Sequence, residues 1–111
     1  MREITIGKSL TGGSTTTVYT IPTGYYALWN LAYLFNSTGS TKTVTMSWYD
    51  ASEDATYDIL HDYSLSSKDF LKFDGGAYIV LEEGDQVTCA PESGATFTIL
   101  ATFELNGSQR S

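Results

Sequence analysis

The chain has 111 residues, of which 41% are hydrophobic and 17% are charged, a composition that indicates one packed domain and argues against disorder. Thirteen acidic residues against six basic ones give a formal net charge of -7, which disfavours binding to nucleic acid or to an anionic membrane surface. No stretch has the roughly 20 apolar residues of a membrane span or the pattern of a signal peptide. We therefore expect a protein that is made and kept in a cytoplasm.

Apolar residues recur with a period of two along most of the chain, which is the pattern of β-strands, and we predict no helix. The first two expected strands cover 3–10 and 16–21, with turn residues between them. Segment 25–35 is apolar on both faces. In its simplest alternation one face carries Tyr25, Ala27, Trp29, Leu31, Tyr33 and Phe35. The turn residues 36–40 then predict a hairpin between this segment and the strand 41–50.

Shorter strands are expected after the acidic loop 50–54, separated by turns that contain Gly, Asp or Pro. Their predicted ranges are 56–61, 69–73, 77–81 and 86–90. A last long strand places Phe97, Ile99, Ala101, Phe103 and Leu105 on one face, and residues 106–111 are expected to be a flexible tail. About eight short strands in one chain predict a single-domain antiparallel β-sandwich with jelly-roll or Greek-key connections.

The residue types used in catalysis give no recognisable pattern. The single histidine, His61, lies between Asp58 and Asp62, but a Ser-His-Asp unit also requires an activated serine and oxyanion donors, and neither has a local signature here. We expect His61 on a half-exposed strand and predict no catalytic residue. The single cysteine, Cys89, is expected in the core.

The acidic clusters are interpreted as loops. Asp50, Glu53, Asp54 and Asp58 could supply oxygen ligands to calcium, but they lack the ligand spacing and the central glycine of an EF-hand loop. The turn 82–85 is acidic in the same way, and we expect it to be solvated. No metal site and no cofactor are predicted.

Aromatic residues provide the most informative surface signal. Six of them fall on two strands that we expect to be adjacent, which is more than one face of a small core readily holds. They are candidates for contact with a partner: Tyr25, Tyr26, Trp29, Tyr33, Trp48 and Tyr49. The alternative is that these rings fill the core and cover ordinary strand surface, since aromatic residues favour strands in any case.

Four segments resemble small virion structural proteins of tailed bacteriophages. They are 19–27 (YTIPTGYYA), 36–42 (NSTGSTK), 47–50 (SWYD) and 82–86 (EEGDQ). The resemblance implies a non-enzymatic β-sandwich that assembles in symmetric copies on a virion. It has no catalytic residue that could be carried over to positions of this chain.

The resemblance implies either a decoration protein on the capsid shell or a part of the tail apparatus. Together with the surplus of aromatic residues on strands, it leads us to expect a capsid decoration protein that binds the shell in many copies. The expected partners are the major capsid protein or tail proteins, and homo-oligomers of the chain itself are expected. A tail-associated adaptor or fibre component is one alternative. A carbohydrate- or receptor-binding module, with Trp29, Trp48 or Tyr49 stacked on sugar rings, is another. A small hydrolase is the third, and it requires a pocket with perturbed acids. The N-terminal segment 1–10 could also pair with a neighbouring subunit by sheet augmentation.

Overall fold

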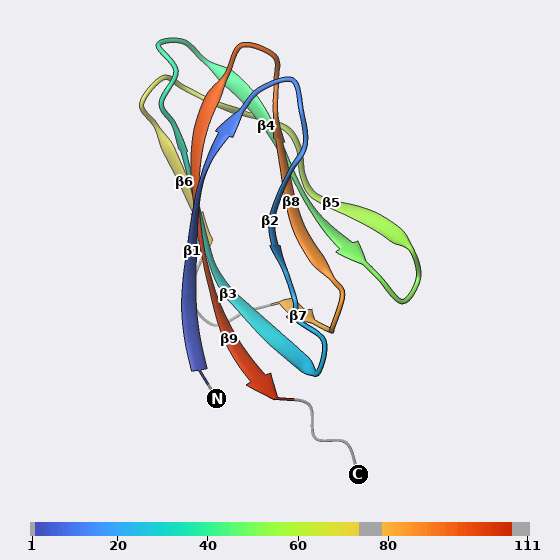
Figure 1. Cartoon of the computed structure of the whole chain (residues 1–111). Coiled ribbons are helices and arrows are strands. Elements are labelled where there is room, and N and C mark those ends of the chain that lie inside the picture. The colour runs from blue at the N-terminus through green and yellow to red at the C-terminus, as the bar shows by residue number, and fades with distance from the viewer. Residues whose placement is uncertain (1, 74–78, 108–111) are drawn as a thin grey trace.

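The computed structural model describes residues 2–73 and 79–107, and in these ranges it contains nine β-strands and no helix (Figure 1). The strands are β1 (Arg2–Thr11), β2 (Thr16–Thr20), β3 (Tyr25–Asn36), β4 (Lys42–Asp50), β5 (Ala55–Leu65), β6 (Phe70–Phe73), β7 (Ile79–Leu81), β8 (Gln86–Pro91) and β9 (Thr96–Gly107). No helix in these ranges has the length and apolar character that crossing a membrane would require. The prediction of an all-β chain is confirmed.

The strands form two antiparallel sheets that pack face to face (Figure 1). Sheet A has the order β1-β9-β3-β6, with β7 also paired to β3, and sheet B has the order β2-β8-β4-β5. Most neighbouring strands are far apart in the sequence because the chain repeatedly crosses from one sheet to the other. This order is that of a jelly roll. The predicted β-sandwich is therefore confirmed, and its connections are of the jelly-roll kind.

The core lies between the sheets and takes every second residue of the strands that build it. All five residues expected on one face of the last strand are buried, namely Phe97, Ile99, Ala101, Phe103 and Leu105. From sheet B, Val87 and Cys89 are buried opposite them, so the prediction that Cys89 is a core residue is confirmed. The period of two was therefore a reliable guide wherever a strand is regular.

The predicted hairpin between 25–35 and 41–50 is wrong. β3 lies in sheet A and β4 lies in sheet B, where β4 forms its hairpin with β5. Residues 37–41 therefore connect the two sheets instead of reversing the chain within one sheet. Turn residues indicate where a strand ends, but they do not indicate which strand the chain joins next.

Asn36 provides the physical reason for this crossing. Its side chain is fully buried, and its Nδ2 lies within hydrogen-bond distance of three backbone carbonyl oxygens, those of Ser40 (3.0 Å), Leu65 (2.9 Å) and Ser66 (3.3 Å). Its Oδ1 accepts a hydrogen bond from the amide of Thr38 (2.9 Å). One amide side chain thus ties the end of β3 to the connection 37–41 and to the end of β5 in the other sheet.

The predicted faces of segment 25–35 hold only as far as Trp29. The register of β3 against β9 shifts between Trp29 and Leu31, which leaves Asn30 as an extra residue. A bulge of this kind reverses the alternation of the strand. Trp29 therefore faces the core, whereas Leu31, Tyr33 and Phe35, which we expected on the same face, point outward on sheet A.

The ends of the chain also differ from expectation. β9 continues to Gly107, and Asn106 and Gly107 pair with Tyr26 and Tyr25, so these two residues do not belong to a tail. Residues 108–111 of the predicted tail lie outside the described residues, as do residues 77 and 78 of the predicted strand 77–81.

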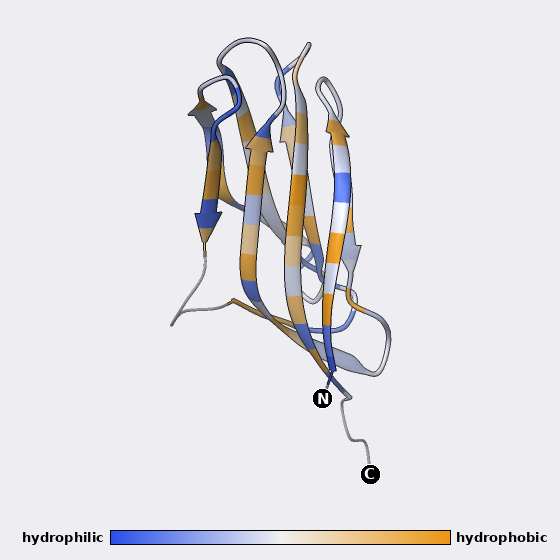
Figure 2. Cartoon of the chain, turned by 90° about the vertical axis from the view of Figure 1, so that its left-hand side faces the viewer, coloured by the Kyte–Doolittle hydropathy of each residue, from blue (hydrophilic) through white to orange (hydrophobic). Residues whose placement is uncertain are grey.

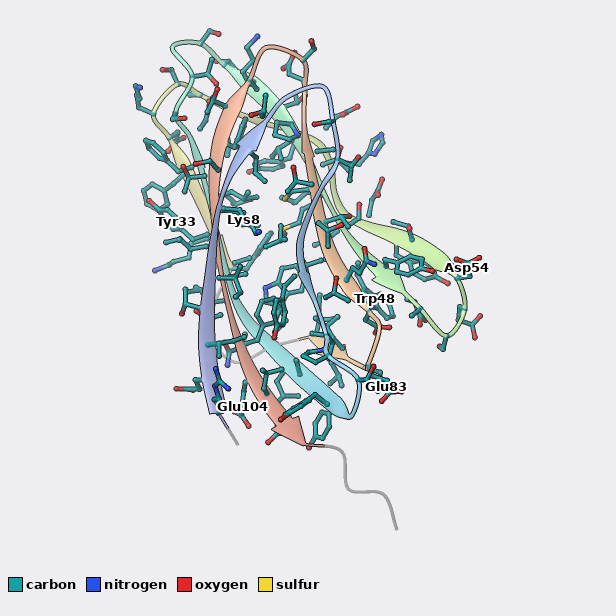
Figure 3. The ribbon with its side chains drawn as sticks, viewed as in Figure 1. Lys8, Tyr33, Trp48, Asp54, Glu83 and Glu104 are labelled. Atoms are coloured by element: carbon teal, nitrogen blue, oxygen red, sulfur yellow. The ribbon has the colours of Figure 1, made fainter. Side chains whose placement is uncertain are left out.

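The N-terminal segment is an integral edge strand, because all ten residues of β1 pair with β9 of the same chain. Lys8 aligns with the buried Ile99, so its side chain leaves β1 on the inner side of the sheet (Figure 3). Removing the N-terminal residues would expose β9, which carries much of the core. A deletion that leaves the fold intact is therefore not available for this segment.

Candidate interaction surface

The six aromatic candidates do not form one surface. Because β3 and β4 belong to different sheets, Tyr33 and Trp48 lie on opposite sides of the sandwich (Figure 3). Trp29 is 5% exposed and is part of the core, where it stacks on Phe103. Tyr25 and Tyr26 are exposed at the beginning of β3. The structure therefore places the six residues in four locations. Trp29 is in the core, Tyr25 and Tyr26 are at the start of β3, Tyr33 is on sheet A, and Trp48 and Tyr49 are on sheet B.

The outward face of sheet A, called face A below, carries the exposed side chains of Leu100 and Phe70. Figure 2 looks onto this sheet, with β6, β3, β9 and β1 side by side and hydrophobic positions along β3 and β9. From the register of these strands, the outward residues of its central rows are Thr5, Gly7, Ser9, Leu31, Tyr33, Phe35, Phe70, Lys72, Thr98, Leu100 and Thr102.

The centre of face A is built around Leu100 and Tyr33, which are paired across β9 and β3. Leu100 remains 39% exposed and Phe70 on β6 remains 52% exposed. The rings of Tyr33 and Phe70 stack with 5.3 Å between their centroids. Gly7 lies beside Leu100 on the edge strand, and a Cβ at this position would come within 3.1 Å of the Leu100 side chain. The glycine thus leaves Leu100 free to lie flat over β1.

Sequence reasoning missed Leu100 and Phe70. Leu100 is the one apolar residue on the outward side of β9, out of phase with the five core residues of that strand. That phase was visible in the sequence and could have identified it as an exposed leucine. Phe70 could not be assigned in this way, because β6 has only four residues and such a short segment has no readable alternation.

The outward face of sheet B, called face B below, is polar. Its residues are mainly Thr, Ser and Gln: Thr17, Thr20, Thr43, Thr45, Ser47, Tyr49, Gln86, Thr88 and Ala90. Tyr49 is its only aromatic residue, and the Tyr49 hydroxyl donates a hydrogen bond to Asp54 Oδ1 at 2.7 Å. This bond raises the pKa of Tyr49. Face B therefore has the polar composition of an ordinary solvated strand surface.

Trp48 is half-buried at the end of β4 and is held from two sides. Its indole N–H donates to Asp85 Oδ2 at 3.1 Å, and its ring stacks on Tyr57 of β5 with centroids 5.4 Å apart. One ring face is therefore already covered. Trp29 is buried in the core. Neither tryptophan of the sugar-stacking hypothesis therefore presents a fully exposed ring.

Asp85 corrects the expectation of a solvated turn at 82–85. Its carboxylate is buried and accepts hydrogen bonds from the amides of Ala51 (2.9 Å) and Glu82 (2.9 Å) in addition to Trp48. Glu83 of the same turn accepts a hydrogen bond from the amide of Gly24 (2.9 Å). The turn thus joins the β4–β5 hairpin to the end of β7, and the carboxylates of Asp85 and Glu83 are structural acceptors.

His61 is exposed on β5 and lies in a short chain of hydrogen bonds. Its Nδ1 is 2.8 Å from Asp58 Oδ2, and the Ser47 hydroxyl donates to Asp58 Oδ1 at 2.7 Å. The three residue types of a catalytic triad therefore meet, but the carboxylate stands in the middle and the histidine does not contact the serine. The bond to Asp58 raises the pKa of His61.

Two further carboxylates of the β4–β5 hairpin, those of Asp50 and Asp54, have separate partners. Asp50 Oδ1 accepts hydrogen bonds from the amide and the hydroxyl of Ser52, and Asp54 is bound by Tyr49. Within residues 2–73 and 79–107 no three His, Cys, Asp or Glu side chains are grouped so that they could hold a metal ion. The hairpin is instead a concentrated negative surface, with five acidic residues at positions 50, 53, 54, 58 and 62.

No family model and no curated protein matches the sequence. Among solved structures, the chain is similar to the globular domain of zebrafish complement 1qA protein, with a TM-score of 0.48, 13% identity, and coverage of 91% of this chain and 94% of that one. It is also similar to a chain of the cyanophage Pam1 capsid asymmetric unit, with a TM-score of 0.48, 18% identity, and coverage of 92% and 82%. Both similarities are distant, and the fold assignment above rests on the strand order.

Proposed function

We propose that this chain is a non-enzymatic virion structural protein of a tailed phage, and that it binds the capsid shell in many copies as a decoration protein. The observation that carries the proposal is the number of large hydrophobic side chains that a complete sandwich leaves exposed. They are Tyr25, Tyr26, Tyr57, Tyr63, Phe70, Phe73, Val80 and Leu100. Exposed aromatic and apolar side chains in this number, spread over both sheets and one end of the sandwich, favour contact with other protein subunits.

The phage context comes from the sequence resemblance, and the structure gives its segments a common role. Segments 19–27 and 82–86 meet at one end of the sandwich, where Ile21 and Asp85 are joined by a backbone hydrogen bond of 2.9 Å. Segment 36–42 forms the crossing between the sheets. These three segments therefore lie at connections between strands of the jelly roll, and the phage context itself rests on the sequence resemblance.

The chemistry of the polar residues supports a non-catalytic role. The Ser47, Asp58 and His61 group has the wrong order for activating a nucleophile. Cys89 is buried, and desolvation raises the pKa of its thiol to about 12, so it is not a nucleophile at neutral pH. A small binding module fits these properties, because many weak contacts on a symmetric particle add up through multivalency.

The proposal is tested by mixing the purified chain with shells and, separately, with tails from the same phage, followed by sedimentation and quantification of the bound copies. Saturable binding to shells at many copies per particle is expected. Binding to tails alone, at a few copies, would contradict the decoration role and place the protein in the tail. Binding to neither particle would contradict a virion role altogether.

A further inference from the structure

The sheet edges of this chain are poor sites for pairing with another strand. On the β1 edge, Lys8 leaves the strand on the same side as the buried Ile99, so a strand added there would bring this charge to an interior position. On the β5 edge, the register against β4 shifts twice between Val44 and Ser47, and Asp62 has a φ of 48°. Inward charges and bulges are known means of preventing edge-to-edge association.

The other edges of the two sheets are short. β2 has five residues, β6 has four and β7 has three. Short edge strands offer few backbone groups to an added strand. Strand addition at the edges is therefore disfavoured, and a contact between copies of this chain through the face of a sheet is favoured over it.

Face A is the sheet face that suits such a contact. Leu100, Tyr33 and Phe70 give it an exposed apolar centre, and the direct neighbours on β1 are the small residues Gly7 and Ser9. Its hydroxyl groups also pair with one another, since the Thr5 and Thr102 side-chain oxygens are 2.9 Å apart. The face is therefore apolar at its centre, with small residues on the adjoining edge strand.

The distribution of charge indicates which kind of partner face A can bind. The chain carries a net charge of -7, so two copies repel each other unless the apposed surfaces avoid the acids. In the central rows of face A, the one charged side chain of the described residues is Lys72; the acids Glu3 and Glu104 lie at one end of the face. By contrast, the β4–β5 hairpin carries five acids at positions 50, 53, 54, 58 and 62.

We propose that face A binds a second copy of this chain, with the two sandwiches packed face to face. A basic partner would bind most strongly to the acidic β4–β5 hairpin, because opposite charges attract there. A second copy, which is itself acidic, meets the least electrostatic repulsion at the apolar centre of face A. The proposal deepens the proposed function, because it assigns the self-association of a decoration protein to one surface.

The test is the mass of the full chain in solution, without shells, by light scattering and sedimentation from low micromolar to near-millimolar concentration. The weight-average mass is expected to rise well above 12.1 kDa with concentration. Leu100→Glu and Phe70→Glu each place an acid in the apolar centre of both copies, and self-association is expected to weaken at least about tenfold. Both positions are exposed, so the fold is retained, and circular dichroism and thermal unfolding verify this.

Thr88→Glu is the matched control, because it adds the same charge at the centre of face B and is expected to leave the mass unchanged. A wild-type mass that stays at 12.1 kDa over the whole range would overturn the proposal. Equal weakening by Thr88→Glu, or no weakening by either variant of face A, would also overturn it. Shell binding is measured separately, so a monomer that still decorates shells contradicts this inference and leaves the proposed function standing.

Discussion

The two outward faces of the sandwich come from equally regular strands, yet they differ in chemistry. Face A presents Leu100, Tyr33 and Phe70, whereas face B presents rows of Thr, Ser and Gln around Thr88. Both faces are backed by the same buried core, so the fold itself does not require this difference. Thr at an outward strand position gives a stable, solvated surface. Face A instead has apolar residues at outward positions of several strands. This difference is the observation on which we base the proposal that face A binds a second copy of the chain.

The largest effect is expected from a substitution that destabilises the connection between β3 in sheet A and β4 in sheet B. Asn36→Asp keeps the size of the side chain but replaces the amide donor with a buried carboxylate that faces the carbonyl oxygens of Ser40, Leu65 and Ser66. We expect a loss of about 4 kcal/mol or more in the free energy of unfolding. Denaturant unfolding measures it.

Asn30→Asp is the control for this change, since Asn30 is the half-buried extra residue of the β3 bulge. A change within about 0.5 kcal/mol is expected there. If Asn36→Asp proved as mild as Asn30→Asp, Asn36 would not be the residue that fixes the crossing.

Two neighbouring positions on β8, 88 and 89, allow the reactivity of a thiol on the outside of sheet B to be compared with that of a thiol on its inside. Cys89 faces the core and its pKa is raised to about 12 by burial, so at pH 8 roughly one thiol in 10,000 is ionised. Reaction with a disulfide reagent is expected to be at least about 1,000-fold slower than for a free thiol.

The matched variant is Thr88→Cys, because its thiol lies on face B one residue away. In this variant one thiol reacts at an ordinary rate while Cys89 stays protected. Rapid modification of Cys89 in the native wild-type protein would show that sheet B opens and that its core is not closed.

Asp85 joins the two sheets at the opposite end of the sandwich from Asn36. In Asp85→Asn, one of the two acceptor oxygens becomes a donor that faces the donors of Trp48, Ala51 or Glu82. A loss of about 2 kcal/mol in the free energy of unfolding is expected. Asp62→Asn, at an exposed carboxylate of β5, serves as the control and should have little effect. A neutral Asp85→Asn would mean that the buried carboxylate is not needed to hold the hairpin.

The smallest expected effect is the pH dependence of stability that comes from the Asp58–His61 pair on β5. The hydrogen bond that His61 donates to Asp58 raises the pKa of His61 above its ordinary 6.5. The hydrogen bonds that Asp58 accepts, from Ser47 first and then from His61, lower the pKa of Asp58. The histidine contribution to stability is therefore present below pH 6.5 and is lost as pH rises through the folded value. The aspartate contribution is lost as pH falls through its folded value, so the pair stabilises most at mildly acidic pH.

Because the chain has one histidine, proton NMR of the imidazole ring reads this titration directly. We expect a midpoint above 6.5 that decreases in Asp58→Asn and decreases less in Asp62→Asn, since the bond to Asp58 is the larger cause. A midpoint that does not respond to Asp58→Asn would show that the Asp58–His61 bond does not form in solution.

The regular strands were predictable because burial on one face requires strict alternation, and β9 follows this rule from Phe97 to Leu105. The positions of the turns were predictable from Gly, Pro and Asn. Two features were not. The bulge at Asn30 reverses the faces of β3 without any Gly or Pro to mark it, and the crossing at Asn36 depends on hydrogen bonds to residues about 30 positions away. The candidate surface depends on both features, so its aromatic residues could be named but not grouped.

The central claim, that face A is covered by another copy of the chain, is tested most directly by NMR over a dilution series. The methyl signals of Leu100 and the ring signals of Tyr33 and Phe70 are expected to shift with concentration, while the methyl signals of Thr45 and Thr88 on face B stay constant. Shifts confined to face B or to the β4–β5 hairpin, or signals that do not move at any concentration, would contradict the claim.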